Sequence, residues 1–166
     1  MIKHGGKMVT EDIIQNKAKQ LLKVTGCSNT FPLPIEMIVE HLGFQCHFYI
    51  PDKDIEDIAS AVSHSKKKIY INQNNTPEQQ LFSIAHKVGH IVLHGDNHDY
   101  IDSPHIHKNL QTEEAEQFAM ELLMPEEHFC KMWHKTNHDI KALLQFFGVT
   151  SELIQKRANY LGLYIT

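Results

Sequence analysis

The feature that most constrains this chain is one strongly signalled helix over residues 77–94, with the sequence PEQQLFSIAHKVGHIVLH. Thr76 stands at the N-cap position, Pro77 at the first helical position and Gln79 where a capping box needs it. Gly95 follows the last turn, as is typical of a helix end. Five apolar residues recur at helical spacing and predict a core-facing side: Leu81, Ile84, Ala85, Val88 and Val92. The other elements are therefore expected to pack around this helix.

Two histidines in this helix have the spacing of metal ligands. His86 and His90 are four residues apart, so a helix places both rings on one face, where they can bind one metal ion. Phe82 and His94 continue this stripe, which is predicted to lie at the edge of the core. The pattern HxxxH is part of HExxH, the zinc-peptidase sequence in which the glutamate deprotonates the metal-bound water.

Lys87 stands where HExxH has its glutamate. An ammonium group cannot accept the proton of the water, and at about 5 Å from a dication it costs on the order of several kcal/mol at an effective dielectric constant of roughly 20. We expect Lys87 either to turn toward solvent or to lose its proton, because a nearby metal lowers the pKa of a lysine. A neutral Lys87 acting as the base is the less favoured of these outcomes, since a flexible amine substitutes poorly for a positioned carboxylate.

A second helix, predicted over residues 111–124, carries the candidates for a third ligand. Glu113, Glu114 and Glu116 crowd its first turns. Carboxylates at this end also interact favourably with the helix dipole, which accounts for at least two of them and leaves one as a candidate ligand. The other close histidine pairs lack a third donor and are predicted to have structural or solvent roles: His105 with His107, and His134 with His138.

The remaining patterns predict an α+β fold with a small antiparallel sheet in a single domain, residues 1–166. Strand-like alternation and helical periodicity are found over these residues: strands 44–49, 58–63 and 68–72, and helices 10–24, 34–42, 125–134, 139–147 and 151–161. Ile13 is predicted to face inward, and Phe48 to lie on the buried side of its strand. Residues 96–108 are polar and predict a loop.

Composition restricts the possible functions. A net charge of −4 with scattered Lys and Arg argues against binding to nucleic-acid phosphates. Residues 140–161 could pass for a helix-turn-helix, but with only Lys141, Lys156 and Arg157 as cations they are better interpreted as packing helices. No run approaches the ~18 apolar residues of a membrane span, and no signal peptide is evident. The three scattered cysteines indicate reduced thiols, so a cytoplasmic protein is expected.

Three runs of the sequence together resemble the ImmA/IrrE family of regulatory metallopeptidases: KKIYINQNNTPEQQLFSIAHKVGHIVLHGD, EEAEQFAMELLMP and FFGVTSELIQKRANYLGL. The resemblance covers nearly the whole chain. It implies a thermolysin-like zincin core over about residues 10–124, a helical C-terminal part over about residues 125–166, and zinc as the cofactor. Members similar to this chain cleave a transcription repressor, often in phage or integrative elements, so the implied partner is a helix-turn-helix repressor.

The same resemblance assigns the ligands. His86 and His90 match the two histidine ligands of the family, and His94 matches a frequent further histidine. Glu114 matches the third ligand. Glu113 is the alternative, because some members place the glutamate earlier in this run.

Lys87 departs from the family, which has its catalytic glutamate at that position. Three explanations remain open: a natural pseudoenzyme that binds its partner without cutting, a substitution introduced or fixed to silence the activity, and altered chemistry. Loss of a general base lowers rates ~10² to 10⁴-fold or more. Two function classes follow, a zinc peptidase acting on a repressor with impaired or absent hydrolysis, and a catalytically dead module that regulates a repressor by binding it. A regulator that binds DNA directly is a third function class, less favoured than the other two.

Overall fold

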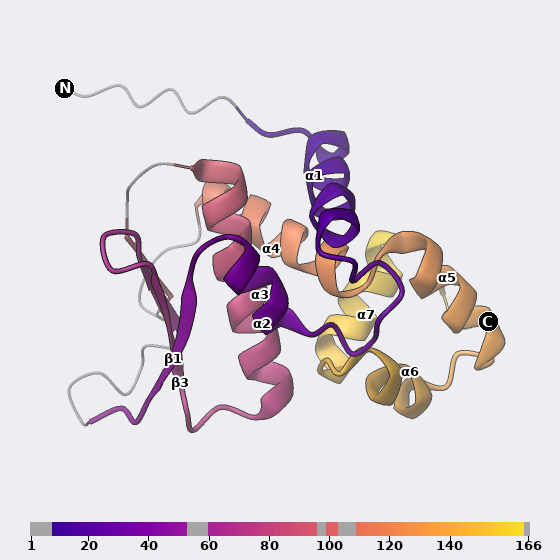
Figure 1. Ribbon diagram of the computed structural model, residues 1–166. Coiled ribbons are helices and arrows are strands. Elements are labelled where there is room, and N and C mark those ends of the chain that lie inside the picture. The colour runs from indigo at the N-terminus through magenta and orange to yellow at the C-terminus, as the bar shows by residue number, and fades with distance from the viewer. Residues whose placement is uncertain (1–7, 53–59, 96–98, 103–108, 165–166) are drawn as a thin grey trace.

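The computed structural model describes residues 8–52, 60–95, 99–102 and 109–164. A four-stranded sheet lies at one end of the molecule, α3 and α4 lie in the middle, and α5, α6 and α7 lie at the other end (Figure 1). The helices are α1 (Glu11–Val24), α2 (Ile35–His41), α3 (Pro77–His94), α4 (Leu110–Leu123), α5 (Glu126–Lys135), α6 (Ile140–Phe147) and α7 (Ser151–Tyr160). The α+β class predicted from the sequence is thereby confirmed.

The sheet is mixed, with the strand order β1-β3-β2-β4. Its strands are β1 (Gln45–Tyr49), β2 (Ser60–Ser63), β3 (Lys68–Asn72) and β4 (Tyr100–Asp102). The antiparallel pairing expected from the sequence holds for β2 with β3 and with β4, whereas β1 runs parallel to β3. The hairpin of β2 and β3 places β3 between β1 and β2.

Three local predictions were wrong, each because tertiary position overrides a sequence pattern. Phe48 is 43% exposed, because β1 is an edge strand and has a neighbour on one side only. Ile13 is 45% exposed, because α1 directs its neighbour Ile14 into the core. The polar segment after Gly95 was expected to be loop throughout, yet Tyr100–Asp102 pairs with β2; residues 96–98 and 103–108 lie outside the described residues.

Helix α3 occupies the centre of the fold, as its sequence predicts. It has the expected capping box between Thr76 and Gln79, with Pro at its start, and it ends at Gly95, which adopts a left-handed conformation at φ 44°. It contacts β2, β3, α2 and α4, so its middle turns are covered on several sides. The residues from Ile84 to His90 are consequently all buried, polar and apolar alike.

Gly89 sets the distance between α3 and α4. A Cβ atom added at Gly89 would lie 2.7 Å from the main-chain oxygen of Ala115 and 3.0 Å from its Cα, closer than real side chains approach a backbone. The absence of a side chain at Gly89 therefore permits a close helix crossing. This crossing lies between His86 and His90 on α3 and beside Glu114 on α4, so it brings the predicted ligands onto facing helices.

A buried ion pair connects α4 to the C-terminal helices. The Arg157 guanidinium donates to both Glu121 carboxylate oxygens, over 2.7 and 2.8 Å, and its Nε donates to the Met124 carbonyl over 3.0 Å. The Arg157 side chain is fully buried. Because the fork geometry satisfies both carboxylate oxygens, this pair fixes α7 against the end of α4.

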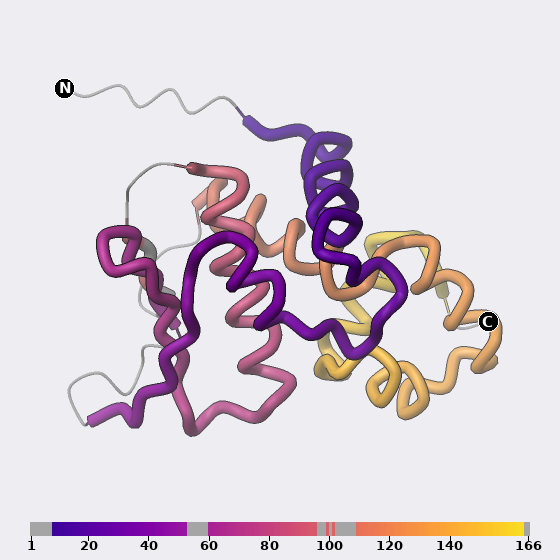
Figure 2. Tube along the Cα trace, viewed as in Figure 1, coloured from indigo at the N-terminus to yellow at the C-terminus, as the bar shows by residue number. Residues whose placement is uncertain are grey.

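Helix α1 packs along α4 and extends beyond the central helices toward the N-terminus (Figure 2). Its buried residues Ile14, Ala18, Leu21 and Leu22 join the main core. The Lys17 ammonium also donates to the Val92 carbonyl in the last turn of α3, over 3.3 Å. The N-terminal part of the chain is thereby held close to the end of α3 that carries His94.

Candidate functional site

The two predicted histidine ligands lie side by side on α3. The ring centroids of His86 and His90 are 5.0 Å apart, and the residues are 7% and 2% exposed. They lie deeper than the core edge predicted from the sequence, because α4 covers this side of α3 at the Gly89 crossing. Phe82, one turn earlier, stacks on His86 with centroids 6.0 Å apart.

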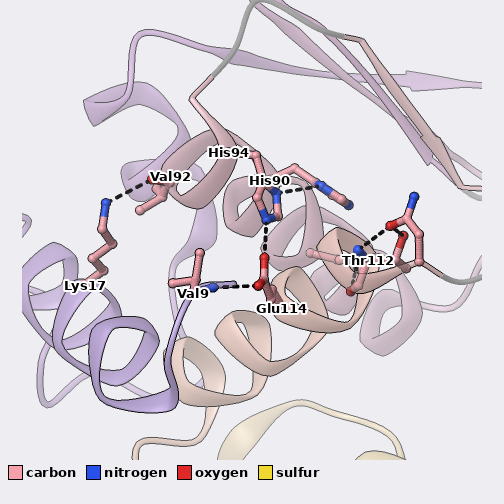
Figure 3. A network of polar contacts seen from close by, with 9 residues as sticks. Val9, Lys17, His90, Val92, His94, Thr112 and Glu114 are labelled. Atoms are coloured by element: carbon pink, nitrogen blue, oxygen red, sulfur yellow. Dashed lines mark hydrogen bonds and ion pairs between the residues drawn. The ribbon is translucent and has the colours of Figure 1, made fainter. Parts of the chain in front are cut away.

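Of the two candidate carboxylates, Glu114 lies at the histidine helix and Glu113 is exposed. The cause is the phase of α4, which begins after the Asn109 cap and directs Glu114 inward beside Ala115. Glu114 is 6% exposed. One carboxylate oxygen lies 2.8 Å from His94 Nε2, and the other accepts a hydrogen bond from the Val9 main-chain N–H over 2.8 Å (Figure 3).

Each of these histidines has a partner that constrains its ring protons. His86 Nε2 lies 3.3 Å from the Thr112 carbonyl oxygen, which can only accept, so this nitrogen carries a proton. His94 Nε2 donates to the Glu114 carboxylate, so in neutral His94 the other nitrogen, Nδ1, is an acceptor. His90 Nδ1 lies 3.2 Å from that acceptor and must then be the donor.

These contacts form a chain of hydrogen bonds instead of a cluster around one point. His94 uses its two nitrogens in different directions, one toward His90 and the other toward Glu114. Both oxygens of Glu114 are engaged, by His94 and by Val9 (Figure 3). The chain therefore runs from α3 through α4 to the residues before α1.

The arrangement does not fit a zinc ion as it stands. A tetrahedral zinc site needs three donor lone pairs directed at one position. Here the nitrogen of His86 that faces α4 carries a proton, and the Glu114 oxygens are occupied by other donors. Across the ranges that the structure describes, no three His, Cys, Asp or Glu side chains are grouped so as to hold a metal ion.

Lys87 is fully buried, at 0% exposure. Of the two outcomes expected for Lys87, the turn toward solvent was wrong, because this turn of α3 is covered on several sides. A buried ammonium is tolerated only among acceptors or opposite charges. The residue that the HExxH comparison aligns with the general base is thus part of the interior.

The remaining histidine and cysteine residues offer no alternative site within the described part of the chain. His134 and His138 have ring centroids 6.4 Å apart, and His138 packs on Trp133 at 5.0 Å. His105 and His107 lie outside the described residues. Cys27, Cys46 and Cys130 are free thiols. Burial, with Glu36 and Glu40 nearby, raises the pKa of Cys46 to about 11, which disfavours the thiolate that metals bind.

A cavity of about 460 Å³ lies next to the histidines, between α3, α4 and α7. Phe82 and Leu153 supply apolar walls, and the Lys156–Glu116 ion pair, 2.9 Å long, lies at its polar side. Because Phe82 also stacks on His86, the cavity shares a wall with the histidine site.

Sequence reasoning missed two parts of this site. His94 was placed on the same helix face as His90 and matched to a further histidine of the family, but its contact with Glu114 was not predicted. Val9 gave no signal, because a main-chain N–H that contacts a residue 105 positions away leaves no trace in the pattern of side chains.

The comparisons place the chain among known proteins. The family model described as the IrrE N-terminal-like domain, Peptidase_M78, matches residues 40–159. The chain therefore belongs to this family, as the resemblance predicted. No curated protein matches the chain significantly.

One similar solved structure is a Mycobacterium tuberculosis transcriptional regulator, with a TM-score of 0.65 and 17% sequence identity. The match covers 88% of this chain and 46% of that chain, so this chain spans less than half of that regulator's length. At this identity the match shows the fold alone. No helix in the described ranges is both long and apolar enough to cross a bilayer.

Proposed function

We propose that this protein is a regulatory member of the IrrE-like family that acts on a repressor-type protein by binding it, with impaired or absent hydrolysis. The observation that carries the proposal is Lys87, which is fully buried and follows His86 where the HExxH sequence has its glutamate. A lysine in its cationic form cannot take a proton from water, so it cannot supply the general base.

The state of Glu114 supports the same proposal. Both of its oxygens accept hydrogen bonds from the protein itself. Two finer predictions belong to this proposal: peptidase ancestry retained as a partner-binding surface, and a phage or mobile-element repressor as partner. Zinc, the cofactor that the family resemblance implies, is expected to be bound weakly or not at all, because the described residues form no metal-binding group. The boundary near residue 124 between core and helical C-terminal part likewise stays a prediction.

The cavity between α3, α4 and α7 supports a binding role. It is large enough for a side chain of a partner, and it adjoins the helix that carries His86. Direct DNA binding is not favoured, because two of the three cations counted for it are already engaged. Arg157 is buried against Glu121, and Lys156 pairs with Glu116.

The proposal is tested with purified protein and the helix-turn-helix repressors encoded in the same genome, with zinc supplied. Lys87→Glu restores a carboxylate at the base position, and Lys87→Gln is the matched control that removes the charge without adding a base. We expect the unaltered protein to bind one repressor without cutting it, and only Lys87→Glu to cut it, in proportion to the fraction of chains that hold zinc. Cleavage by the unaltered protein at the rate of Lys87→Glu would overturn the proposal, as would failure to bind any of the repressors.

A further inference from the structure

Strand β1 is an edge strand of the sheet and leaves main-chain groups open on one side. It runs parallel to β3, and the described residues place no strand on its other side. The Gln45 N–H donates to the carbonyl just before β3 over 3.0 Å, and the Tyr49 carbonyl accepts from the N–H just after β3 over 2.8 Å. Because alternate residues of a strand bond to the same neighbour, Cys46 and Phe48 direct their N–H and C=O groups to the open side.

The side chains beside this open edge are apolar on the strand and acidic on the adjoining helix. Phe48 is 43% exposed and Ile50, just after the strand, is 73% exposed. Helix α2 packs beside β1 and presents Glu36 and Glu40, both exposed and one turn apart (Figure 1). Among the described residues, neither carboxylate takes part in an ion pair. The edge therefore combines unpaired hydrogen-bonding groups, an exposed apolar strip and two negative charges.

The two carboxylates lie close to the middle of the edge. Burial, and then the charges of Glu36 and Glu40, raise the pKa of the Cys46 thiol to about 11, so both carboxylates are near this residue. Cys46 is also one of the two residues whose main-chain groups face the open side. A ligand that pairs with β1 thus passes the negative charges of α2.

We propose that the open edge of β1 binds an extended basic segment of a protein partner, which adds a strand to the sheet. The main chain of this segment bonds to Cys46 and Phe48, and an apolar side chain covers Phe48. A lysine or arginine two positions along the segment reaches the carboxylates on α2, because alternate side chains of a strand lie on the same face.

The charges favour this occupant over a second copy of the chain. Antiparallel pairing of two copies through β1 would bring Glu36 and Glu40 of one copy toward the same residues of the other, and like charges facing each other oppose association. The inference does not depend on the proposed function, because neither β1 nor α2 contributes a residue to the histidine site.

Hydrogen exchange with a model peptide tests the proposal. In the probe peptide, threonine occupies every second position, and lysine alternates with valine at the others; the control peptide has glutamate in place of lysine. In the free protein the Cys46 and Phe48 amides should exchange fast and the His47 amide, which faces β3, slowly. We expect the lysine peptide alone to slow the exchange of Cys46 and Phe48 and to leave His47 unchanged.

Three results would overturn the proposal. The first is exchange at Cys46 and Phe48 that the lysine peptide does not change, and the second is equal binding of the glutamate peptide. The third is slow exchange of these amides in the free protein that increases in rate on dilution, which would identify a second copy of the chain as the occupant.

The outward N–H of Phe48 can be removed without affecting the bonds to β3. Proline is tolerated where the N–H of an edge strand faces away from the sheet, so Phe48→Pro is the test variant, and Phe48→Ala is the matched control that keeps the donor. We expect Phe48→Pro to bind the lysine peptide about fivefold more weakly than Phe48→Ala in fluorescence anisotropy, the effect of one hydrogen bond. Equal affinities would overturn the strand pairing. If Phe48→Pro does not fold, a lysine peptide with methylated main-chain nitrogens is used with the unaltered protein, and binding as tight as that of the unmethylated peptide would overturn it.

The acidic residues are tested separately. The double variant Glu36→Gln with Glu40→Gln should bind the lysine peptide about fivefold more weakly at low salt, and the difference should shrink at high salt. The control removes two exposed carboxylates from other helices, by Asp12→Asn with Glu127→Gln, and should bind as the unaltered protein does. Equal affinities of the two double variants would overturn the role of α2 in selecting a basic segment.

Discussion

Helix α4 carries two buried carboxylates, Glu114 near its start and Glu121 two turns later, and they are satisfied in different ways. Both terminal nitrogens of the Arg157 guanidinium donate to Glu121, one to each carboxylate oxygen. This guanidinium is always charged, and its planar geometry matches that of a carboxylate. Glu114 is held by one ring nitrogen of His94 and by one main-chain N–H from a distant segment, neither of which is a permanent cation. The partners of Glu121 thus indicate a structural role, whereas the hydrogen-bond partners of Glu114 can be replaced by other donors.

The comparison predicts the largest loss of stability when the Arg157–Glu121 ion pair is broken. Arg157→Ala should lower the free energy of unfolding by about 3–5 kcal/mol, because it leaves the Glu121 carboxylate buried without its cation. Urea denaturation measures the change. The double variant Arg157→Met with Glu121→Leu removes both charges and should recover most of the loss. A loss under about 1 kcal/mol in Arg157→Ala would contradict the structural role.

The close crossing of α3 and α4 at Gly89 predicts the next largest loss of stability. Gly89→Ala should destabilise by about 1–3 kcal/mol, since the added Cβ meets the backbone of Ala115 and forces α3 away from α4. Ser83→Ala on the same helix is the control and should stay within about 0.5 kcal/mol. Equal stability of the glycine and serine variants in thermal and urea unfolding would show that the crossing is not tight.

At Glu114, the substitution Glu114→Gln should lower the free energy of unfolding by about 1–2 kcal/mol. It weakens two hydrogen bonds to a charged acceptor but leaves the shape of the side chain unchanged. Glu113→Gln is the matched control, one residue away and exposed, and should change stability by less than about 0.5 kcal/mol. Both are measured by urea denaturation. If the two variants are alike, Glu114 is not held as described.

The smallest effect is expected at the surface. Lys156→Ala removes an ion pair with Glu116 whose lysine is 46% exposed, so the stability change should be at most about 1 kcal/mol and smaller in high salt. A larger loss, insensitive to salt, would mean that this pair supports the packing of α7 on α4 much as Arg157 does.

These regions also show how far the sequence can predict the structure. The bounds of helix α3 were predicted correctly, because the signals at its ends are local: a capping box, a proline and a glycine at the end. The placement of Glu114 inward and Glu113 outward was not decided by periodicity alone. That choice depends on the packing of α4 against α3 at Gly89, a contact between distant parts of the chain.

The burial of Lys87 was missed for a related reason. The two histidines were expected at the edge of the core, and a turn of Lys87 toward solvent was one of its two expected outcomes, which holds for a helix covered on one side. Helix α3 is covered by the sheet and by α4 together, and so even its charged residue is interior. The parallel pairing of β1 with β3 is likewise a contact between strands that are not consecutive in the chain, which the sequence pattern does not specify.

The most direct test of this account is the zinc content of the full chain purified from cells supplied with zinc, measured by elemental analysis. The hydrogen-bond chain from His90 through His94 and Glu114 to Val9 predicts clearly less than one zinc per chain. One tightly held zinc per chain, lost in Glu114→Gln and in a His86→Ala variant, would contradict it and restore the three-ligand site that the family resemblance implies.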